Sequence, residues 1–310
     1  MKHPILIKLA ILLSVTLLVF SAGSCVQTPA WIPPVQAPAR TGPALFRLSH
    51  TNATMYFFGS VHIGTTDFYP LPDIVEEAFK ESENLVVEFN TQALSPIAAY
   101  MLMSKHLMYP ATDSLNAHLS PGLVAKLDIT MSNFGIMPIV YRQMKPILVD
   151  MTLTALASKN LGYDETLGVD VHFLTQAVKL GKTIYELESA EEQFNYIAAI
   201  PEDTAILSLS TTVDEISTLG ESLARLVSAW KTGDLQALEQ ESNRTYLEHP
   251  GLKPVSDILI DKRNMSMTNR LEALVKKGGT YFVVVGAMHI SGEGSIVDLM
   301  SKRGYVVQRL

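Results

Sequence analysis

The chain has 310 residues, of which 47% are hydrophobic and 18% are charged. This composition supplies enough apolar side chains for a folded core and carries too little charge for a disordered chain. The net charge of −7 at pH 7 argues against a polybasic nucleic-acid-binding protein. Because Cys25 is the single cysteine, the chain forms no intramolecular disulfide and no cysteine-based zinc or iron–sulfur centre, so any bound metal must use His, Asp or Glu ligands.

The amino terminus has the pattern of an export signal. Lys2 and Lys8 flank the start of an apolar run, residues 9–20, whose length of about a dozen residues suits a signal peptide rather than a membrane span. Small residues then lead to Cys25, and this arrangement resembles the lipobox of bacterial lipoproteins, with Ala22 where such boxes usually carry Leu. We therefore expect a signal peptide over residues 1–24, with simple cleavage and no lipid as the alternative.

Residues 25–43 are expected to form a lipidated amino terminus and a proline-rich tether, because five prolines within them favour extended backbone. Val26 follows the cysteine instead of Asp, which in lipoproteins implies sorting to the outer membrane. The expected location is the periplasmic face of the outer membrane, with the lipid anchor as the membrane contact. A soluble periplasmic protein is the alternative.

A weak internal repeat is the main feature of the remaining residues, 44–310, which we expect to form one domain. A predicted strand over residues 55–58 leads into Gly59-x-x-His62-Ile63, and a second over residues 281–285 leads into Gly286-x-x-His289-Ile290. Continuous apolar strands of this kind are typical of a sheet covered on both faces. Glycine at the strand end allows a sharp turn, so each histidine is expected at the sheet edge where α/β proteins bind ligands.

A third strand is predicted over residues 84–89, after a helix over residues 72–82, and it carries Glu88 near its end. A buried acid is costly unless another group pairs with it. Two imidazoles and one carboxylate at three strand ends would suit a divalent metal such as Zn²⁺, Mn²⁺ or Co²⁺. The alternative is that each histidine is an ordinary hydrogen-bonded structural residue.

The other expected elements provide secondary candidates. Asp170 begins a helix that ends before Gly181, and it either caps this helix or orients a histidine. A strand over residues 182–188 ends in Glu188, for which a substrate-binding or supporting role is considered, and a capping box begins the next helix at Ser189. Further elements are predicted as mainly helical residues 95–161, helices 218–232, 235–247, 255–277 and 295–301, and a strand 305–308.

These motifs together resemble the TraB/GumN family, which includes the Tiki metalloproteases and is similar to the erythromycin esterase and ChaN-type superfamily. The residues that carry the resemblance, in chain order, are Gly59-x-x-His62, Glu88, Gly168-Val169-Asp170, Glu192-Gln193, Arg263-Asn264 and Gly286-x-x-His289. The resemblance implies an α/β fold with a duplicated mixed-sheet core, flanking helices and a helical insertion between the two Gly-x-x-His halves. It also implies a site on His62, His289 and Glu88, supported by Gly59, Gly286, Asp170 and Asn264.

The sequence thus predicts a metal-dependent, peptidase-like hydrolase acting on a peptide or protein. The expected metal ligands are His62, His289 and Glu88, Arg263 is expected to stabilise a developing oxyanion, and either Glu88 or Glu188 is expected to act as base. Two alternatives remain. One is a hydrolase without metal that uses His62 as base, and the other is a binding protein that holds a peptide or haem without turnover.

Overall fold

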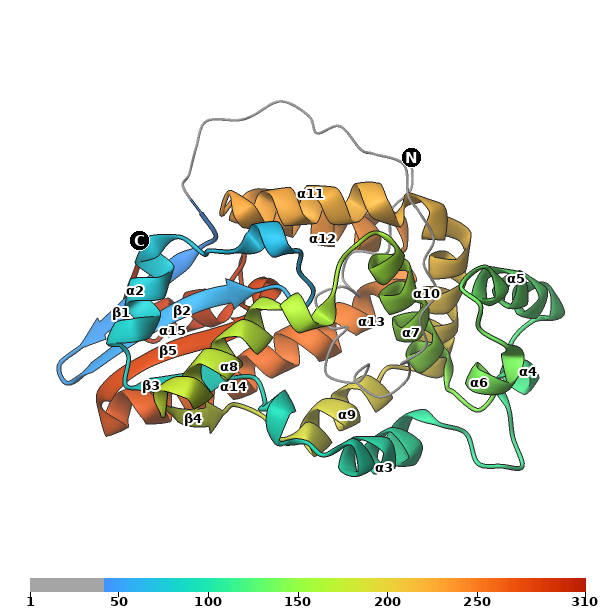
Figure 1. Cartoon of the computed structure of the whole chain (residues 1–310), viewed down its shortest axis with the longest axis horizontal. Helices are drawn as coiled ribbons and strands as arrows, with labels where there is room; N and C mark the ends of the chain where they lie inside the picture. Colours follow the sequence, from blue (N-terminus) through green and yellow to red (C-terminus); the bar gives the residue numbers. More distant parts are fainter. Residues whose placement is uncertain (1–41) are drawn as a thin grey trace.

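The computed structural model describes residues 42–310, so the expected signal peptide, Cys25 and most of the tether lie outside the described residues. The described residues form a mixed α/β structure around a six-stranded sheet with strand order β4-β3-β5-β2-β1-β6. The predicted α/β class is confirmed, whereas the duplication of the core stays a prediction. Figure 1 shows the sheet toward one end of the molecule and the helices α4 to α7 and α10 toward the other.

Four neighbouring strands of the sheet run in the same direction. β2 pairs in parallel with β5, β5 with β3, and β3 with β4, whereas β1 is antiparallel to both β2 and β6. The strands span β1 Leu45–His50, β2 Ala53–Ser60, β3 Asn84–Val87, β4 Thr183–Glu186, β5 Gly279–Gly286 and β6 Val306–Arg309. The carboxyl ends of the four parallel strands therefore meet at one edge of the sheet.

Helices cover both faces of the sheet and form a layer beyond it. The helices span α2 Asp73–Glu81, α3 Pro96–Leu107, α4 Leu115–His118, α5 Pro121–Asn133, α6 Pro138–Tyr141, α7 Pro146–Asn160, α8 Val169–Leu180, α9 Ala190–Ala198, α10 Glu202–Glu215, α11 Leu219–Lys231, α12 Leu235–Glu248, α13 Lys253–Ser256, α14 Lys262–Lys277 and α15 Ile296–Lys302. A π-helix, Asp257–Asp261, leads directly into α14, and a short 3-10 helix, Ala287–His289, follows β5.

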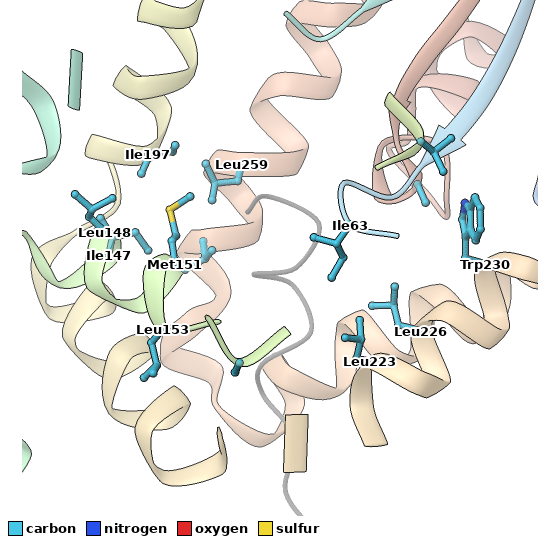
Figure 2. Packing of buried hydrophobic residues seen from close by; sticks show 14 of the residues in the cluster. Ile63, Ile147, Leu148, Met151, Leu153, Ile197, Leu223, Leu226, Trp230 and Leu259 are labelled. Atoms are coloured by element: carbon cyan, nitrogen blue, oxygen red, sulfur yellow. The ribbon is translucent and has the colours of Figure 1, made fainter. Parts of the chain in front are cut away.

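The core consists of two apolar clusters, one on each face of the sheet. The larger cluster includes Phe58 and Val284 from the strands together with residues of α2, α7, α8 and α11. The smaller cluster joins the opposite face, including Phe57, to α14 and α15. Figure 2 shows part of the larger cluster, in which Leu223, Leu226 and Trp230 project from α11 toward the loop that carries Ile63. The loop after β2 is thus anchored by packing on this face.

Most predicted elements agree with the structure within a few residues, and the differences are local. The strand predicted to include Glu88 ends at Val87, the strand predicted to residue 188 ends at Glu186, and the single helix predicted over residues 255–277 is divided between α13, the π-helix and α14. The strand β1 and the helix α10 were not predicted. Among residues 42–310, no helix has the length and apolar character needed to cross a membrane.

Candidate metal centre at the edge of the sheet

The candidate site lies where the four parallel strands end. β2 ends at Ser60, two residues before His62, and β3 ends at Val87, immediately before Glu88. β5 ends at Gly286, and the 3-10 helix after it carries His289. Because parallel strands end at the same edge, residues separated by more than two hundred positions meet there. His62, Glu88 and His289 thus all follow strand ends at this edge.

Glu88 is at the centre of this group. One carboxylate oxygen, Oε1, accepts a hydrogen bond of 2.7 Å from the backbone N–H of Gly286 and lies 3.7 Å from Nε2 of His289. The other oxygen, Oε2, accepts hydrogen bonds from Arg263 and, at 3.3 Å, from Nε2 of Gln193. The backbone and two side chains thus fix the carboxylate, and one of its oxygens faces the histidines.

Each histidine is oriented through its Nδ1 atom. Nδ1 of His289 lies 2.6 Å from Oδ1 of Asn264, whose Nδ2 donates to the carbonyl of Gly294 at 2.9 Å. The second bond fixes the amide so that Oδ1 is the acceptor, and His289 therefore carries its proton on Nδ1 and leaves Nε2 free of hydrogen. Nδ1 of His62 lies 3.3 Å from Oδ1 of Asp170, so its Nε2 also faces away from its partner.

Asp170 does not cap α8 through its side chain. Gly168 is the residue at the N-cap position, and no side-chain cap hydrogen bond is present there. Asp170 instead lies in the first turn of the helix, where the helix dipole favours a carboxylate, and it contacts His62. The structure therefore favours orientation of a histidine over capping.

Gly286 leaves open the space toward which these donors point. A Cβ atom at this position would lie 3.4 Å from Oε1 of Glu88 and 3.6 Å from Nε2 of His62, with Cδ2 of His289 also at 3.6 Å. The φ angle of Gly286 is −50°, which any residue adopts. The absence of a side chain at Gly286 therefore matters for the space that it leaves, and not for its backbone conformation. At Gly59, a Cβ atom would lie only 2.9 Å from Cα of Ala287. The carbonyl of Gly59 accepts a hydrogen bond from Nε1 of Trp230.

Arg263 connects two acids that follow neighbouring strands. Its Nε and Nη2 atoms donate to both oxygens of Glu188, at distances between 2.8 and 3.0 Å, and Nη2 also donates to Glu88. Its Nη1 donates to the carbonyl of Leu259, within the π-helix, at 3.1 Å. Glu188 and Arg263 are 1% and 5% exposed. The guanidinium is thus buried between carboxylates, and Glu188 lies behind it rather than beside the histidines.

The pKa values of the two histidines are shifted in opposite directions. Burial lowers the pKa of His289 to about 3, so its imidazole is neutral at physiological pH. Burial also disfavours charge on His62, but Asp170 and Glu88 outweigh it and raise its pKa to about 9. Burial would raise the pKa of Glu88, but Arg263 and the two histidines hold it well below its usual range. Burial raises the pKa of Glu188 against the opposing effect of Arg263.

The donor types fit a divalent metal, although the side chains are not already arranged around one common point. Within residues 42–310, no three His, Cys, Asp or Glu side chains are already arranged as a group that could hold a metal ion. The chemistry is nevertheless suitable, since Nε2 of His62 and Oε1 of Glu88 both lie close to Gly286, and Nε2 of His289 lies 3.7 Å from the same carboxylate oxygen. In addition, both Nδ1 atoms have an oxygen partner, as is usual for ligating histidines.

Sequence analysis missed two polar residues at this site. Ser60 and Gln193 line a cavity of about 20 Å³ together with His62, Glu88 and Asp170. Gln193 is named above only as part of the family motif, and Ser60 is not among the predicted site residues. The place of Ser60 two residues before His62, directly after the first glycine of the Gly-x-x-His motif, was a signal that could have identified it.

Fold and site together define an α/β protein with a histidine–carboxylate site at the carboxyl edge of a mostly parallel sheet. The model of the TraB/PrgY/gumN family matches residues 44–309, and the chain belongs to this family. The resemblance to the TraB/GumN family that the sequence motifs indicated is therefore confirmed.

Two kinds of relative are similar to the chain. The uncharacterised protein YbaP of Escherichia coli (strain K12) is 27% identical over 260 residues, which cover 84% of this chain and 92% of YbaP. Human metalloprotease TIKI1 is 22% identical over 301 residues, which cover 82% of this chain and 59% of TIKI1. The metalloprotease TIKI homolog of Amphimedon queenslandica is also 22% identical, over 83% of this chain and 59% of its own length. The chain thus spans about three fifths of these TIKI relatives, and no solved structure matches it.

Proposed function

We propose that this protein is a metal-dependent hydrolase that cleaves peptide bonds in the bacterial cell envelope. The observation that carries the proposal is the convergence of His62, His289 and Glu88 around the space above Gly286. Relatives named metalloprotease support the reaction class, because they share the family and most of this chain aligns with them. The envelope location rests on the export signal and on lipidation of Cys25.

His62, His289 and Glu88 would hold the ion, whose identity among Zn²⁺, Mn²⁺ and Co²⁺ is left open. When bound, such an ion lowers the pKa of water and polarises a carbonyl group. Asn264 keeps the Nε2 lone pair of His289 available, and Asp170 does the same for His62 once His62 loses its extra proton. Arg263 keeps Glu88 ionised and fixed in position.

The contacts alter two roles expected from the sequence. Arg263 is already bound by two carboxylates and a carbonyl, so we assign it to holding Glu88 rather than to binding an oxyanion. Both oxygens of Glu188 accept from Arg263, so we assign Glu188 to holding the guanidinium rather than to taking a proton from water. In the hydrolysis, the water oxygen forms a bond to the carbonyl carbon, the C–N bond breaks, and a water proton ends on the leaving nitrogen.

A second candidate function has one specific observation in its favour. His62 is paired with Asp170 and has a pKa raised to about 9, so without metal it carries a proton beside Glu88 at neutral pH. A protonated imidazole can donate its proton to a leaving group as a general acid, so this candidate uses His62 as acid rather than as the base expected from the sequence. This candidate predicts activity that survives complete removal of metal.

The test is cleavage of a peptide library, followed by mass spectrometry, with metal-loaded protein, chelated protein and chelated protein to which metal is restored. We expect cleavage that is lost on chelation, regained with metal and reduced at least about a hundredfold in Glu88→Gln, since loss of one charged ligand removes affinity and reactivity together. Glu77→Gln, at an exposed position on α2, is the control and should retain full activity. Cleavage that is unaffected by chelation would favour the second candidate, and no cleavage by either the metal-loaded or the chelated protein would contradict both.

A further inference from the structure

Ser60 is a buried polar residue that the contacts described so far leave unexplained. It is the last residue of β2, is paired with Gly286 of β5 and is only 2% exposed. Among the described residues, its Oγ atom has no hydrogen-bond partner. Buried hydroxyl groups in folded proteins nearly always have a partner, and leaving one without a partner costs free energy. An alanine would avoid this cost, so the hydroxyl needs an explanation.

The side chain of Ser60 faces the cavity beside the candidate site. Alternate residues of a strand share a face, so Ser60 lies on the face of Phe58, which belongs to the larger apolar cluster. Val87, Leu174 and Val284 are on that face too, and they line the cavity of about 20 Å³ to which Ser60 contributes. The hydroxyl therefore lies at the junction between apolar walls and the charged groups of the site.

The cavity has the size and polarity of a site for a single water molecule. A water molecule needs roughly 10–15 Å³ of such space and two to four polar partners. Ser60, His62, Glu88, Asp170 and Gln193 all line the cavity. Oδ1 of Asp170 is buried and, apart from its 3.3 Å contact with His62, has no hydrogen-bond partner in the described part of the chain.

We propose that Ser60 is a positioning residue that binds a water molecule in this cavity, beside His62 and Glu88, and that this is the water consumed in hydrolysis. The second half of the proposal rests on the proposed function. The hydroxyl both donates and accepts, so it can bind the water in either orientation, while Val87, Leu174 and Val284 form apolar walls of the cavity. The water oxygen is then held next to the site at which a carbonyl carbon would be attacked.

The direct test is a high-resolution crystal structure of the wild type and of Ser60→Ala. We expect density for one water within hydrogen-bond distance of Ser60 Oγ in the wild type and its loss or displacement in the variant. A wild-type cavity without solvent density would overturn the proposal. Ser158→Ala is the matched control. Ser158 lies on α7 and is similarly buried, but its hydroxyl donates to the carbonyl of Thr154.

The kinetic test uses the peptide substrate identified above. Ser60→Ala should lower kcat at least tenfold with little change in KM or in metal content, and its Tm should equal or exceed that of the wild type. A merely structural hydroxyl would instead lower Tm and leave kcat unchanged, as expected for Ser158→Ala, and that result would overturn the role in hydrolysis. If the wild type shows the water but hydrolyses no peptide, the proposed function fails while the water site at Ser60 stands.

Discussion

A substitution of Gly286 tests most simply whether a metal ion binds between His62, His289 and Glu88. Its backbone conformation is open to any residue, and a Cβ atom would make only ordinary contacts, 3.4 to 3.6 Å, with Glu88, His62 and His289. Since those contacts are with the donor groups themselves, a methyl group at this position would occupy the space that an ion needs.

We therefore expect Gly286→Ala to fold with a stability within about 1 kcal/mol of the wild type while losing metal affinity by at least tenfold. Denaturant unfolding and metal titration measure the two effects separately. Gly59→Ala is the contrasting variant, because its Cβ would lie 2.9 Å from the backbone of Ala287 and should destabilise the fold. Unchanged metal affinity in Gly286→Ala would show that the ion binds elsewhere.

Arg263 is expected to contribute to stability as well as to the site. Replacing it with leucine leaves the carboxylates of Glu88 and Glu188 buried without their partner. Removing one member of a buried ionic group typically costs about 3–5 kcal/mol. The control is Arg270→Leu, because Arg270 and Glu192 have side chains 40% and 41% exposed and such pairs contribute at most about 1 kcal/mol. Equal losses in urea unfolding would contradict this account.

Only part of the site could be predicted at the level of residues. His62 and His289 follow predicted strands and Glu88 lies near the end of a third, so their place at the sheet edge follows from local sequence. The contacts between Asp170 and His62 and between Arg263 and Glu88 join residues 108 and 175 positions apart. No spacing rule indicates such pairs, because they depend on how α8 and α14 pack against opposite faces of the sheet.

Among the helices, α8 is the element whose position most directly controls His62. Its N-cap residue, Gly168, packs against the loop after β2, and the N–H of Val169 donates to the carbonyl of Val61 at 2.9 Å. A Cβ on Gly168 would lie 2.4 Å from the backbone oxygen of His62. The glycine therefore permits the close approach that brings Asp170 to His62.

We expect Gly168→Ala to cost about 1–3 kcal/mol, because backbone atoms cannot move aside as a flexible side chain can. It should also weaken metal binding by shifting His62 relative to Asp170. Gly122→Ala is the matched control in α5, where a Cβ would meet nothing within 4 Å, and it should be neutral or stabilising by up to about 1 kcal/mol. Thermal unfolding and metal titration of both variants measure these effects, and a stable Gly168→Ala protein with normal affinity would refute the role of this contact.

The elements that sequence analysis missed have identifiable causes. α10 buries polar residues, since Ser208 and Thr212 donate to the buried carboxylate of Asp150 in α7. Ala205, Leu209 and Val213 of the same helix are buried at helical spacing, but the buried hydroxyl residues between them weaken the contrast between apolar and polar faces on which prediction relies. The π-helix before Arg263 was likewise not predicted, because its wider turn has no clear sequence signature.

At the scale of the whole molecule, the described fold begins just after the proline-rich segment. The family match starts at residue 44 and β1 starts at Leu45, and the tether before them stays a prediction. Attachment to the membrane is proposed to depend on acyl chains at Cys25, because the net negative charge gives no general attraction to anionic lipids.

We expect Cys25→Ser to move the protein from the membrane fraction of bacterial cells to the soluble periplasmic fraction and to abolish labelling by a fatty-acid analogue. The metal content and stability of the folded part should not change, since Cys25 precedes the described residues. Wild-type protein that is found in the soluble periplasmic fraction and is not labelled by the fatty-acid analogue would contradict the lipid anchor and would leave simple cleavage of the signal peptide as the explanation.

The central claim is that His62 and His289 bind one metal ion, and metal content measures this most directly. The protein is purified without chelator or affinity-tag metal, supplied with Mn²⁺, Co²⁺ or Zn²⁺, and analysed by plasma mass spectrometry as wild type, His62→Ala, His289→Ala and the control His118→Ala. His118 pairs with Asp113 and Glu202, away from the sheet edge. We predict close to one equivalent in the wild type and the control and a large loss in both site variants, with folding retained by circular dichroism. Wild-type protein that binds none of these metals would contradict the metal centre.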